Sequence, residues 1–326
     1  MQKIHIGIIG GAGYTGGELL RVLLRHPNAA ITFVHSTSNA GELVSNVHRD
    51  LLGDTDLIFS NELNQSIDIL FLCLGHGDAK KFLAANLINT NIKIIDLSQD
   101  FRLSKEAVIG DRTFVYGLPE LQKASIQKAH NIANPGCFAT AIQLGLLPLA
   151  AKNILTDVYT TGITGSTGAG QGLSVTSHFS WRANNIQAYK TLDHQHLHEI
   201  EQSLAQLQGN QAAQVHFVPW RGDFTRGIFV TSVISTDLTI DALYAIYEAY
   251  FEGHAFTYVS RNKIDLKQVV NTNKCLIHIE KQGNKVAIHS VIDNLLKGAV
   301  GQAVQNMNLL FGLEETSGLQ LKATYF

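Results

Sequence analysis

The chain has 326 residues, of which 45% are hydrophobic and 16% charged, and its formal net charge is −2. This length suits one large domain or two of ordinary size. Positive charges are scattered, so nothing favours nucleic-acid binding, and no stretch is long and apolar enough to predict a membrane span. The chain shows no signal-peptide pattern, and its three cysteines are few and widely spaced, which predicts a soluble protein of the reducing cytoplasm.

Short apolar runs alternate with helical patterns in the first part of the chain. We expect strands at residues 4–9, 30–35, 67–74 and 92–97, and helices that begin near Thr15 and Asp78, the first of them closed by Pro27. Strands that alternate with helices in this way indicate a doubly wound parallel sheet.

The pattern changes beyond about residue 150. Residues 227–235, 275–280 and 285–292 alternate apolar and polar side chains, as half-exposed antiparallel strands do. Helical patterns cover residues 193–207, 239–251 and 294–310. The predicted fold class is therefore α/β, with a parallel-sheet domain followed by an α+β domain whose sheet is largely antiparallel, and a boundary near residues 134–137.

A glycine-rich turn follows the first expected strand. Gly11, Gly13 and Gly16 fit the spacing G-x-G-x-x-G, while Gly10 with Gly13 and Gly16 fits a related spacing. Such glycines let the backbone approach a pyrophosphate at the N-terminus of the next helix, which here begins near Tyr14 and Thr15. We expect a dinucleotide site, the alternative being an ordinary tight turn.

The end of the second expected strand bears on the choice of dinucleotide. NAD-binding proteins usually carry an acid there for the ribose 2′-hydroxyl, whereas this chain has Ser36, Thr37 and Ser38. These neutral groups can donate hydrogen bonds to a 2′-phosphate that an acid would repel. They therefore favour NADP over NAD.

One cysteine stands out by its position. Cys137 follows Asn-Pro-Gly and precedes an apolar helical stretch, so we expect it at a helix N-terminus, where the helix dipole favours a thiolate. Cys137 is thus a candidate nucleophile. Cys73 and Cys275 lie in expected strands, which indicates structural roles.

A cysteine nucleophile needs an acid or base beside it, and the densest histidine cluster is His194, His196 and His198. Residues two apart on a helix do not share a face, and no HExxH spacing is present. We therefore expect no metal site. One histidine of the three is expected to be functional, and the pattern does not select which.

These motifs together resemble the N-acetyl-gamma-glutamyl-phosphate reductase family over nearly the whole chain. The resemblance rests on ordered segments at residues 11–16, 98–103, 116–121, 134–137, 165–170, 194–200, 292–299 and 301–308. It implies NADPH-dependent reduction of N-acetyl-γ-glutamyl phosphate to a semialdehyde in arginine biosynthesis, with release of phosphate through a cysteinyl thioester.

The resemblance also assigns roles to residues. It makes Cys137 the nucleophile and His196 the acid and base, and it implies that the last helix packs on the nucleotide domain. The expected domains are then residues 1–136 completed by residues 294–326, and a catalytic and oligomerisation domain of residues 137–293. Further cofactor contacts are implied for five residues: Ser166, Gly168, Asn294, Lys297 and Gly298.

The sequence defines the substrate-binding residues less completely than the catalytic ones. We expect Arg102 to bind the phosphate through its guanidinium, with an ion pair as the alternative, and Asn134 and His194 to bind substrate. Gln171 and Gln195 stand where the family usually has cations, so details of carboxylate and acyl recognition stay open. The N-acyl group could be acetyl, succinyl or another group, on a glutamyl or aminoadipyl phosphate.

Two other activities fit parts of the pattern. An aspartate-semialdehyde dehydrogenase would share the nucleotide loop and the thiol chemistry, but it typically carries Asn-Pro-Asn-Cys where this chain has Asn-Pro-Gly-Cys. A non-catalytic NADP-binding regulator would keep Cys137 only as a redox sensor or a structural residue. For the enzyme we expect a small-molecule acyl phosphate as substrate and a homodimer or homotetramer as the assembly.

Overall fold

The structure is a computed structural model that describes residues 3–209 and 213–325. Residues 1, 2 and 326, which end the expected domains, lie outside the described residues. The chain divides into two compact units. The first runs to Pro135 and includes Ala299–Gln320, and the second comprises Gly136–Gly298 with the residues from Leu321 onward.

The first unit is built on an eight-stranded sheet in the order β3-β2-β1-β4-β5-β8-β7-β6. All neighbours pair in parallel except β6 and β7. The strands are β1 (Ile4–Ile9), β2 (Ala29–His35), β3 (Phe59–Ser60), β4 (Ile69–Leu72), β5 (Lys93–Asp96), β6 (Val108–Ile109), β7 (Arg112–Tyr116) and β8 (Asn131–Ala133). The prediction of a doubly wound parallel sheet is confirmed, and the central strands are buried because they carry continuous Ile, Leu and Phe runs.

The helices of the first unit are α1 (Tyr14–Leu23), α2 (Val44–Val47), α3 (Asp78–Ala85), α4 (Pro119–Lys128) and α9 (Gly301–Leu310). Short 3₁₀ turns cover Arg49–Leu51 and Ser104–Glu106. The last helix, α9, is buried along its whole length and packs against α1 and α4. Its residues thus complete the core of the first unit although they come from the end of the chain.

The helix expected over residues 294–310 is present from Leu296 onward, but its first turn is π-helical. A π-helical turn over Leu296–Val300 precedes α9, which begins only at Gly301. The N–H of Gly298 donates to the carbonyl oxygen of Asp293, five residues back, at 2.9 Å, which is the hydrogen bond of a π-helix. Oδ1 of Asp293 accepts hydrogen bonds from the N–H groups of Leu295 and Leu296 at 2.8 and 3.1 Å. The two bonds to Oδ1 cap the start of the helical segment.

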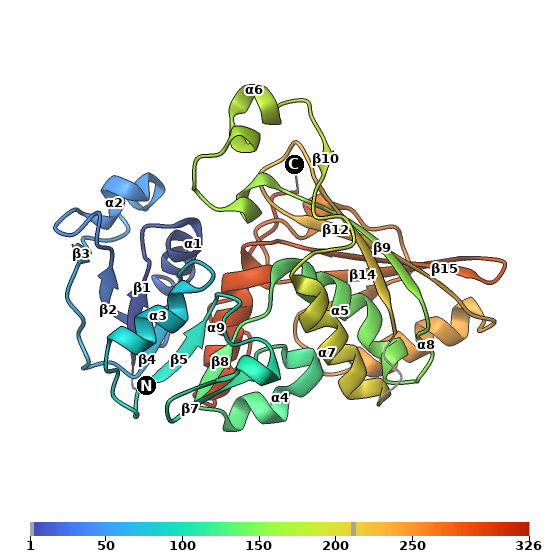
Figure 1. Cartoon of the computed structure of the whole chain (residues 1–326), viewed down its shortest axis with the longest axis horizontal. Coiled ribbons are helices and arrows are strands. Elements are labelled where there is room, and N and C mark those ends of the chain that lie inside the picture. Colours follow the sequence, from blue (N-terminus) through green and yellow to red (C-terminus); the bar gives the residue numbers. More distant parts are fainter. Residues whose placement is uncertain (1–2, 210–212, 326) are drawn as a thin grey trace. The chain divides into compact units, whose positions relative to one another are not determined.

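The second unit holds a seven-stranded sheet in the order β10-β11-β9-β12-β15-β14-β13. Figure 1 labels β9, β12, β14 and β15 of this sheet, and the helices α5, α7 and α8 of the same unit. Four of its six neighbouring pairs are antiparallel, so the expectation of a largely antiparallel sheet is confirmed. The strands are β9 (Val158–Thr164), β10 (Gln187–Ala188), β11 (Val215–Arg221), β12 (Ile228–Ser235), β13 (Thr257–Ser260), β14 (Cys275–Gln282) and β15 (Lys285–Ile292).

Helices cover one face of this sheet. They are α5 (Cys137–Ala150), which contacts β12 and β15, α7 (His196–Gln208), which contacts α5 and β11, and α8 (Ile240–Phe251), which contacts β13 and β14. Every residue of α5 after Cys137 is buried, which makes α5 the centre of the core. The short α6 (Phe179–Arg182) and the 3₁₀ turns Ser166–Ala169, Val175–Ser177 and Leu266–Gln268 complete the unit.

The opposite face of the same sheet carries apolar side chains that none of the described helices of the unit covers. Tyr159 on β9 is 60% exposed, and Trp220 on β11 and Phe229 on β12 are half-buried. A shallow hollow of about 220 Å³ lies on this face, lined by Thr161, Ile163, Ile186, Trp220, Phe229 and Thr231. The sheet therefore presents an apolar surface to its surroundings.

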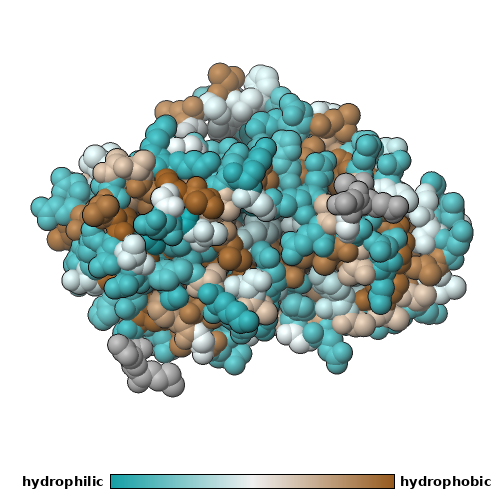
Figure 2. Space-filling model, turned by 60° about the horizontal axis from the view of Figure 1, so that its bottom comes forward, coloured by the Kyte–Doolittle hydropathy of each residue, from teal (hydrophilic) through white to brown (hydrophobic). Residues whose placement is uncertain are grey.

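Across residues 3–209 and 213–325, no helix is long and apolar enough to cross a membrane. Figure 2 shows a face on which hydrophilic residues interrupt the hydrophobic ones.

No group of three or more His, Cys, Asp and Glu side chains in this described part is arranged to hold a metal ion.

Candidate functional site

The glycine loop joins β1 to α1 in the first unit. Gly10 has a φ of +78°, and a Cβ on it would lie 2.3 Å from the carbonyl oxygen of Cys73. A Cβ on Gly16 would lie 2.6 Å from the carbonyl oxygen of Gly10. Both positions therefore need glycine to make the tight turn between strand and helix.

Gly13 has no such packing requirement, because a Cβ there would meet nothing nearer than 3.8 Å. It is the N-cap of α1, it makes no side-chain cap, and the first turn contains no acidic residue. Tyr14 and Thr15 follow as the first helical residues. The helix start has no side-chain cap, and the glycine backbone before it leaves room for a pyrophosphate. These residues therefore suit the dinucleotide that the sequence predicts.

Hydroxyl groups gather at the end of β2. The side-chain amide of Asn39 donates hydrogen bonds to Ser36 Oγ at 3.0 Å and to Ser38 Oγ at 3.1 Å. Thr37 between them is exposed, and residues 35–40 contain no carboxylate. Because Asn39 occupies acceptor positions on both serines, their O–H groups are left to donate to an anion.

Cys137 is the first residue of α5, as the sequence predicts, and it is half-buried. Gly136 forms the N-cap without a side-chain cap, and no acidic residue lies in the first turn of the helix. The backbone of Gly298 comes very close, since a Cβ on Gly298 would lie 2.8 Å from the Cβ of Cys137. Only a glycine at position 298 lets the π-helical turn reach the thiol.

A carboxylate that sequence reasoning missed lies beside the cysteine. Glu199 in α7 is 3% exposed, and its Oε2 accepts a hydrogen bond from the N–H of Gly136 at 3.0 Å. Its Oε1 lies 3.8 Å from Nε2 of His196, which is itself buried. The structure thus brings Cys137, His196 and Glu199 together around the start of α5.

The three clustered histidines differ in their surroundings. His198 is exposed, whereas His194 and His196 are buried with ring centroids 4.6 Å apart. Nδ1 of His194 accepts a hydrogen bond from the N–H of His196 at 3.2 Å. Burial, with a smaller contribution from the charge of Lys190, lowers the pKa of His194 to about 4, so its ring is neutral near pH 7.

The segment before these histidines has an uncommon backbone. Lys190 and Leu192 both adopt positive φ angles, of 46° and 62°. Left-handed backbone at non-glycine residues is costly and collects at functional sites. Here it shapes the turn that carries Tyr189 and His194, whose ring centroids lie 5.9 Å apart. Burial raises the pKa of Tyr189 to about 12, and the charge of Cys137 adds to that shift.

An ion pair supports the turn that reaches Cys137. Arg226 donates from Nε and Nη2 to the two oxygens of Asp293, both at 3.1 Å. The carbonyl oxygen of Asp293 accepts from the N–H of Gly298 at 2.9 Å. Arg226 and Asp293 therefore hold Gly298 in place, a role visible only once the fold brings β12 and β15 together.

The remaining residues implied by the resemblance in this unit have their own contacts. Asn294 accepts a hydrogen bond from the N–H of Gly227 at 2.7 Å and donates to Thr167 Oγ1 at 3.0 Å, which ties it to the Ser166–Ala169 turn that contains Gly168. Lys297 is fully buried, with its Nζ 6.0 Å from the centroid of the Phe256 ring. Their contact with a cofactor stays a prediction.

Arg102 and Asn134 lie in the first unit, and their side chains form hydrogen bonds with other residues of that unit. Arg102 is 5% exposed and donates to the carbonyl oxygens of Asn134 and Leu97 at 2.9 and 3.1 Å. The Asn134 side chain donates to the carbonyl oxygen of Ala299 and accepts from Asn306. These bonds assign both residues a part in holding the segment before Pro135, and their contact with substrate stays a prediction.

The other two cysteines have structural surroundings. Burial raises the pKa of the Cys73 thiol, which follows β4. Cys275 is buried at the start of β14, with its Sγ 3.4 Å from Ser290 Oγ. Neither lies at a helix start, in contrast to Cys137.

Two family models match the chain. Residues 5–129 match the NAD-binding domain of semialdehyde dehydrogenases, and residues 137–294 match the semialdehyde dehydrogenase dimerisation domain. Together they cover most of the chain.

Curated relatives match over the full length. The N-acetyl-gamma-glutamyl-phosphate reductase of Parabacteroides distasonis is 56% identical over 325 residues, which are 99% of this chain and 100% of the relative. The reductase of the same name from Flavobacterium johnsoniae is 55% identical over 324 residues, with the same coverage.

Solved structures share the fold at low identity. Aspartate semialdehyde dehydrogenase II of Vibrio cholerae aligns with a TM-score of 0.73 at 17% identity, covering 96% of this chain and 99% of that one. The aspartate semialdehyde dehydrogenase of Candida albicans, solved with NADP, aligns with a TM-score of 0.67 at 13% identity, covering 95% and 99%. At this identity the likeness establishes the fold alone.

Proposed function

Since the chain belongs to the N-acetyl-gamma-glutamyl-phosphate reductase family, we propose that it reduces N-acetyl-γ-glutamyl phosphate to N-acetylglutamate 5-semialdehyde. The reductant is NADPH, and inorganic phosphate is released. This is a step of arginine biosynthesis. The family name agrees with the resemblance found from the motifs of the sequence.

One observation carries the chemical part of the proposal. Cys137 stands at the start of a buried helix, and Glu199 contacts both the N–H of Gly136 and the imidazole of His196. A thiol at a helix N-terminus is favoured as thiolate, and an imidazole held by a carboxylate can take up and return a proton. These are the groups that covalent acyl transfer requires.

In the proposed reaction the thiolate of Cys137 attacks the acyl carbon of the substrate. A carbon–sulfur bond forms, the bond from carbon to the phosphate oxygen breaks, and phosphate leaves with its electron pair. The backbone N–H groups at the start of α5 stabilise the oxyanion. The resulting thioester accepts hydride at its carbonyl carbon and a proton at its oxygen from His196. The thiohemiacetal then loses the aldehyde and restores the thiol.

The bound nicotinamide supplies the hydride. On the protein side, the α1 N-terminus at Gly13 would hold the pyrophosphate, with Gly10, Gly11 and Gly16 forming the turn. The hydroxyl groups of Ser36, Thr37 and Ser38 would bind the 2′-phosphate. Ser166, Gly168, Asn294, Lys297 and Gly298 are the remaining proposed cofactor contacts.

The proposed assembly is a homodimer formed through the open face of the seven-stranded sheet. Tyr159, Trp220 and Phe229 supply apolar area there, and the dimerisation-domain match covers these strands. A second copy would bury that area against its own equivalent face. Sedimentation equilibrium separates this assembly from a tetramer. The proposed location is the cytoplasm, where NADPH and reduced thiols are maintained.

The activity is tested in the reverse direction with purified protein. N-acetylglutamate 5-semialdehyde and NADP are expected to yield NADPH only when inorganic phosphate is present, and Cys137→Ser is expected to abolish the reaction. If the wild type binds NADP but forms no NADPH with the aldehyde, the chain is an NADP-binding protein of another kind and the proposal fails.

A further inference from the structure

A buried arginine in the second unit has donors that nothing in the described chain satisfies. Arg182, the last residue of α6, is 7% exposed. Its Nη1 donates to the carbonyl oxygen of Arg221 at 3.1 Å, but its Nε and Nη2 are buried and meet no hydrogen-bond acceptor among the described residues. A buried charged group whose donors have no acceptor costs free energy, and an anionic ligand would remove that cost by accepting from them.

A second arginine lies beside it. Arg221 ends β11, and its Cζ lies 4.8 Å from the centroid of the Tyr189 ring. Its Nε is also buried and makes no hydrogen bond within residues 3–209 and 213–325. No carboxylate of the described chain forms an ion pair with Arg182 or Arg221, and the Arg182 side chain reaches the backbone of Arg221.

This pair is close to the candidate nucleophile. Tyr189 lies between Arg221 and His194, with the His194 ring 5.9 Å from the Tyr189 ring and 4.6 Å from the ring of His196. The charge of Cys137 is near enough to contribute to the pKa of Tyr189. The Arg221 guanidinium is therefore linked to the reacting groups through the rings of Tyr189, His194 and His196.

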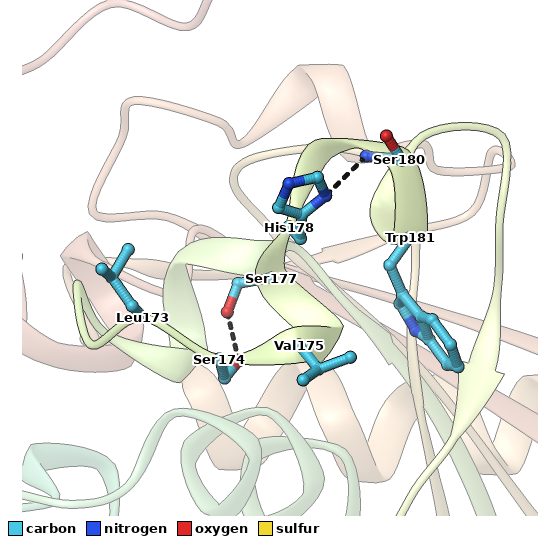
Figure 3. A pocket seen from close by; sticks show the side chains of 7 residues that line it. All are labelled: Leu173, Ser174, Val175, Ser177, His178, Ser180 and Trp181. Carbon is cyan, nitrogen blue, oxygen red and sulfur yellow. Dashed lines mark hydrogen bonds between the residues drawn. The ribbon is translucent and has the colours of Figure 1, made fainter.

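The hollow beside α6 is a different feature. It measures about 660 Å³ and is lined by Leu173, Ser174, Val175, Ser177, His178, Ser180 and Trp181 (Figure 3). Arg182 is not among the lining residues. The lining also contains no charged acid or base other than a histidine. The unsatisfied guanidinium donors are thus a separate site from this apolar hollow.

We propose that Arg182 and Arg221 bind a carboxylate of the acyl amino acid that reacts at Cys137, and so select the substrate. The planar fork of a guanidinium matches a carboxylate with two parallel hydrogen bonds. The carboxylate has two possible sources, the α-carboxylate of the glutamyl part or the end of an N-succinyl group. This inference rests on the proposed function, since the same thiol must attack the other end of that molecule.

Three aldehydes identify the carboxylate: N-acetylglutamate 5-semialdehyde, its α-amide, and N-succinylglutamate 5-semialdehyde. If the two arginines bind the α-carboxylate, the wild-type KM is about 10- to 100-fold higher for the α-amide, because the amide loses the charge-assisted hydrogen bonds. If they bind a succinyl carboxylate, the wild-type KM is lower for the succinyl substrate by a similar factor. Equal KM values for all three aldehydes would overturn the inference, and this comparison needs no variant.

Variants then assign the effect to residues. Arg182→Gln and Arg221→Gln are expected to raise KM about 10- to 100-fold for the preferred aldehyde and to erase its advantage over the others, with a smaller change in kcat. Arg182→Lys should recover part of the loss, because it restores the charge without the fork. Arg261→Gln, at an exposed arginine of the same unit, is the control.

The results separate the two proposals. If the wild type forms no NADPH with any aldehyde, the proposed function fails. If the wild type is active but folded Arg182→Gln and Arg221→Gln keep its KM values, the enzyme stands and this inference alone is wrong.

Discussion

Glu199 touches the start of the helix that carries Cys137. Its Oε2 accepts the N–H of Gly136 at 3.0 Å, while its Oε1 lies 3.8 Å from Nε2 of His196. One buried carboxylate therefore sets the position of the imidazole relative to the helix start. The same carboxylate thereby places the imidazole that the proposed proton transfer uses.

Replacing this carboxylate by an amide tests that arrangement. Glu199→Gln can still accept from Gly136 but has no charge, so we expect kcat to fall about 10-fold or more, with little change in KM. The pH–rate profile of the variant should differ from that of wild type. Glu201→Gln in the same helix is the control. An unchanged pH profile in the folded variant would contradict a positioning role for Glu199.

Gly298→Ala tests the close approach of the π-helical turn to the thiol. The added methyl would lie 2.8 Å from the Cβ of Cys137, so one of the two segments must move. We expect kcat to fall about 10-fold or more and the rate of Cys137 alkylation by iodoacetamide to change. Gly172→Ala, where a Cβ meets nothing within 4 Å, should behave as wild type. Full activity in Gly298→Ala would mean that this contact is not needed for the reaction.

Ser38→Asp tests the choice of cofactor. A carboxylate at the exposed end of β2 would repel the 2′-phosphate of NADPH, while NADH lacks that group. We expect KM for NADPH to rise about 10-fold relative to KM for NADH. Ser66→Asp adds the same charge to an exposed position of the same unit and serves as control. Equal effects of the two substitutions on the NADPH-to-NADH ratio would remove Ser38 from the phosphate site.

His194 makes stability depend on pH. Its pKa is about 4 in the folded protein and 6.5 without the fold, so the unfolded chain binds the proton more tightly. The stabilisation is complete above pH 6.5 and is lost as pH falls from 6.5 towards 4, by roughly 3 kcal/mol. Urea unfolding across this range should therefore be less pH-dependent in His194→Gln than in wild type or in the exposed control His5→Gln. Identical slopes in all three proteins would refute this assignment.

The sequence predicts elements well where the pattern is local and strong. The continuous apolar runs of β1 and β4 and the alternation of β12 and β15 are recovered, because burial on one or both faces dictates those side chains. β9, with the sequence VYTTGIT, and β11, with VHFVPWR, escape prediction. Their exposed or half-buried positions carry Tyr, Trp and Val, and their buried ones include Thr, Gly and Pro, so polarity does not mark the two faces.

The candidate site likewise contains residues that the sequence predicts and residues that it does not. The glycine turn and the cysteine at a helix start each lie within one short segment, so the sequence reveals them. Glu199 and Gly136 are 63 residues apart, and only the packing of α7 on α5 joins them. The close neighbour of Gly298 is Cys137 of α5, and the partner of Arg182 is Arg221 of β11, so these contacts also join distant segments. Because the two partners of each contact are far apart in the sequence, no short motif indicates these contacts.

The central claim is that Cys137 carries the acyl group as a thioester between the acyl phosphate and the aldehyde. Mixing the enzyme with N-acetylglutamate 5-semialdehyde and NADP without phosphate tests it most directly, since the reverse reaction must then stop at the thioester. The account predicts a burst of NADPH that approaches one equivalent per subunit, an added acyl mass on the peptide that contains Cys137, and neither signal in Cys137→Ser. A burst with no acyl mass on that peptide, or a burst retained in Cys137→Ser, would contradict it.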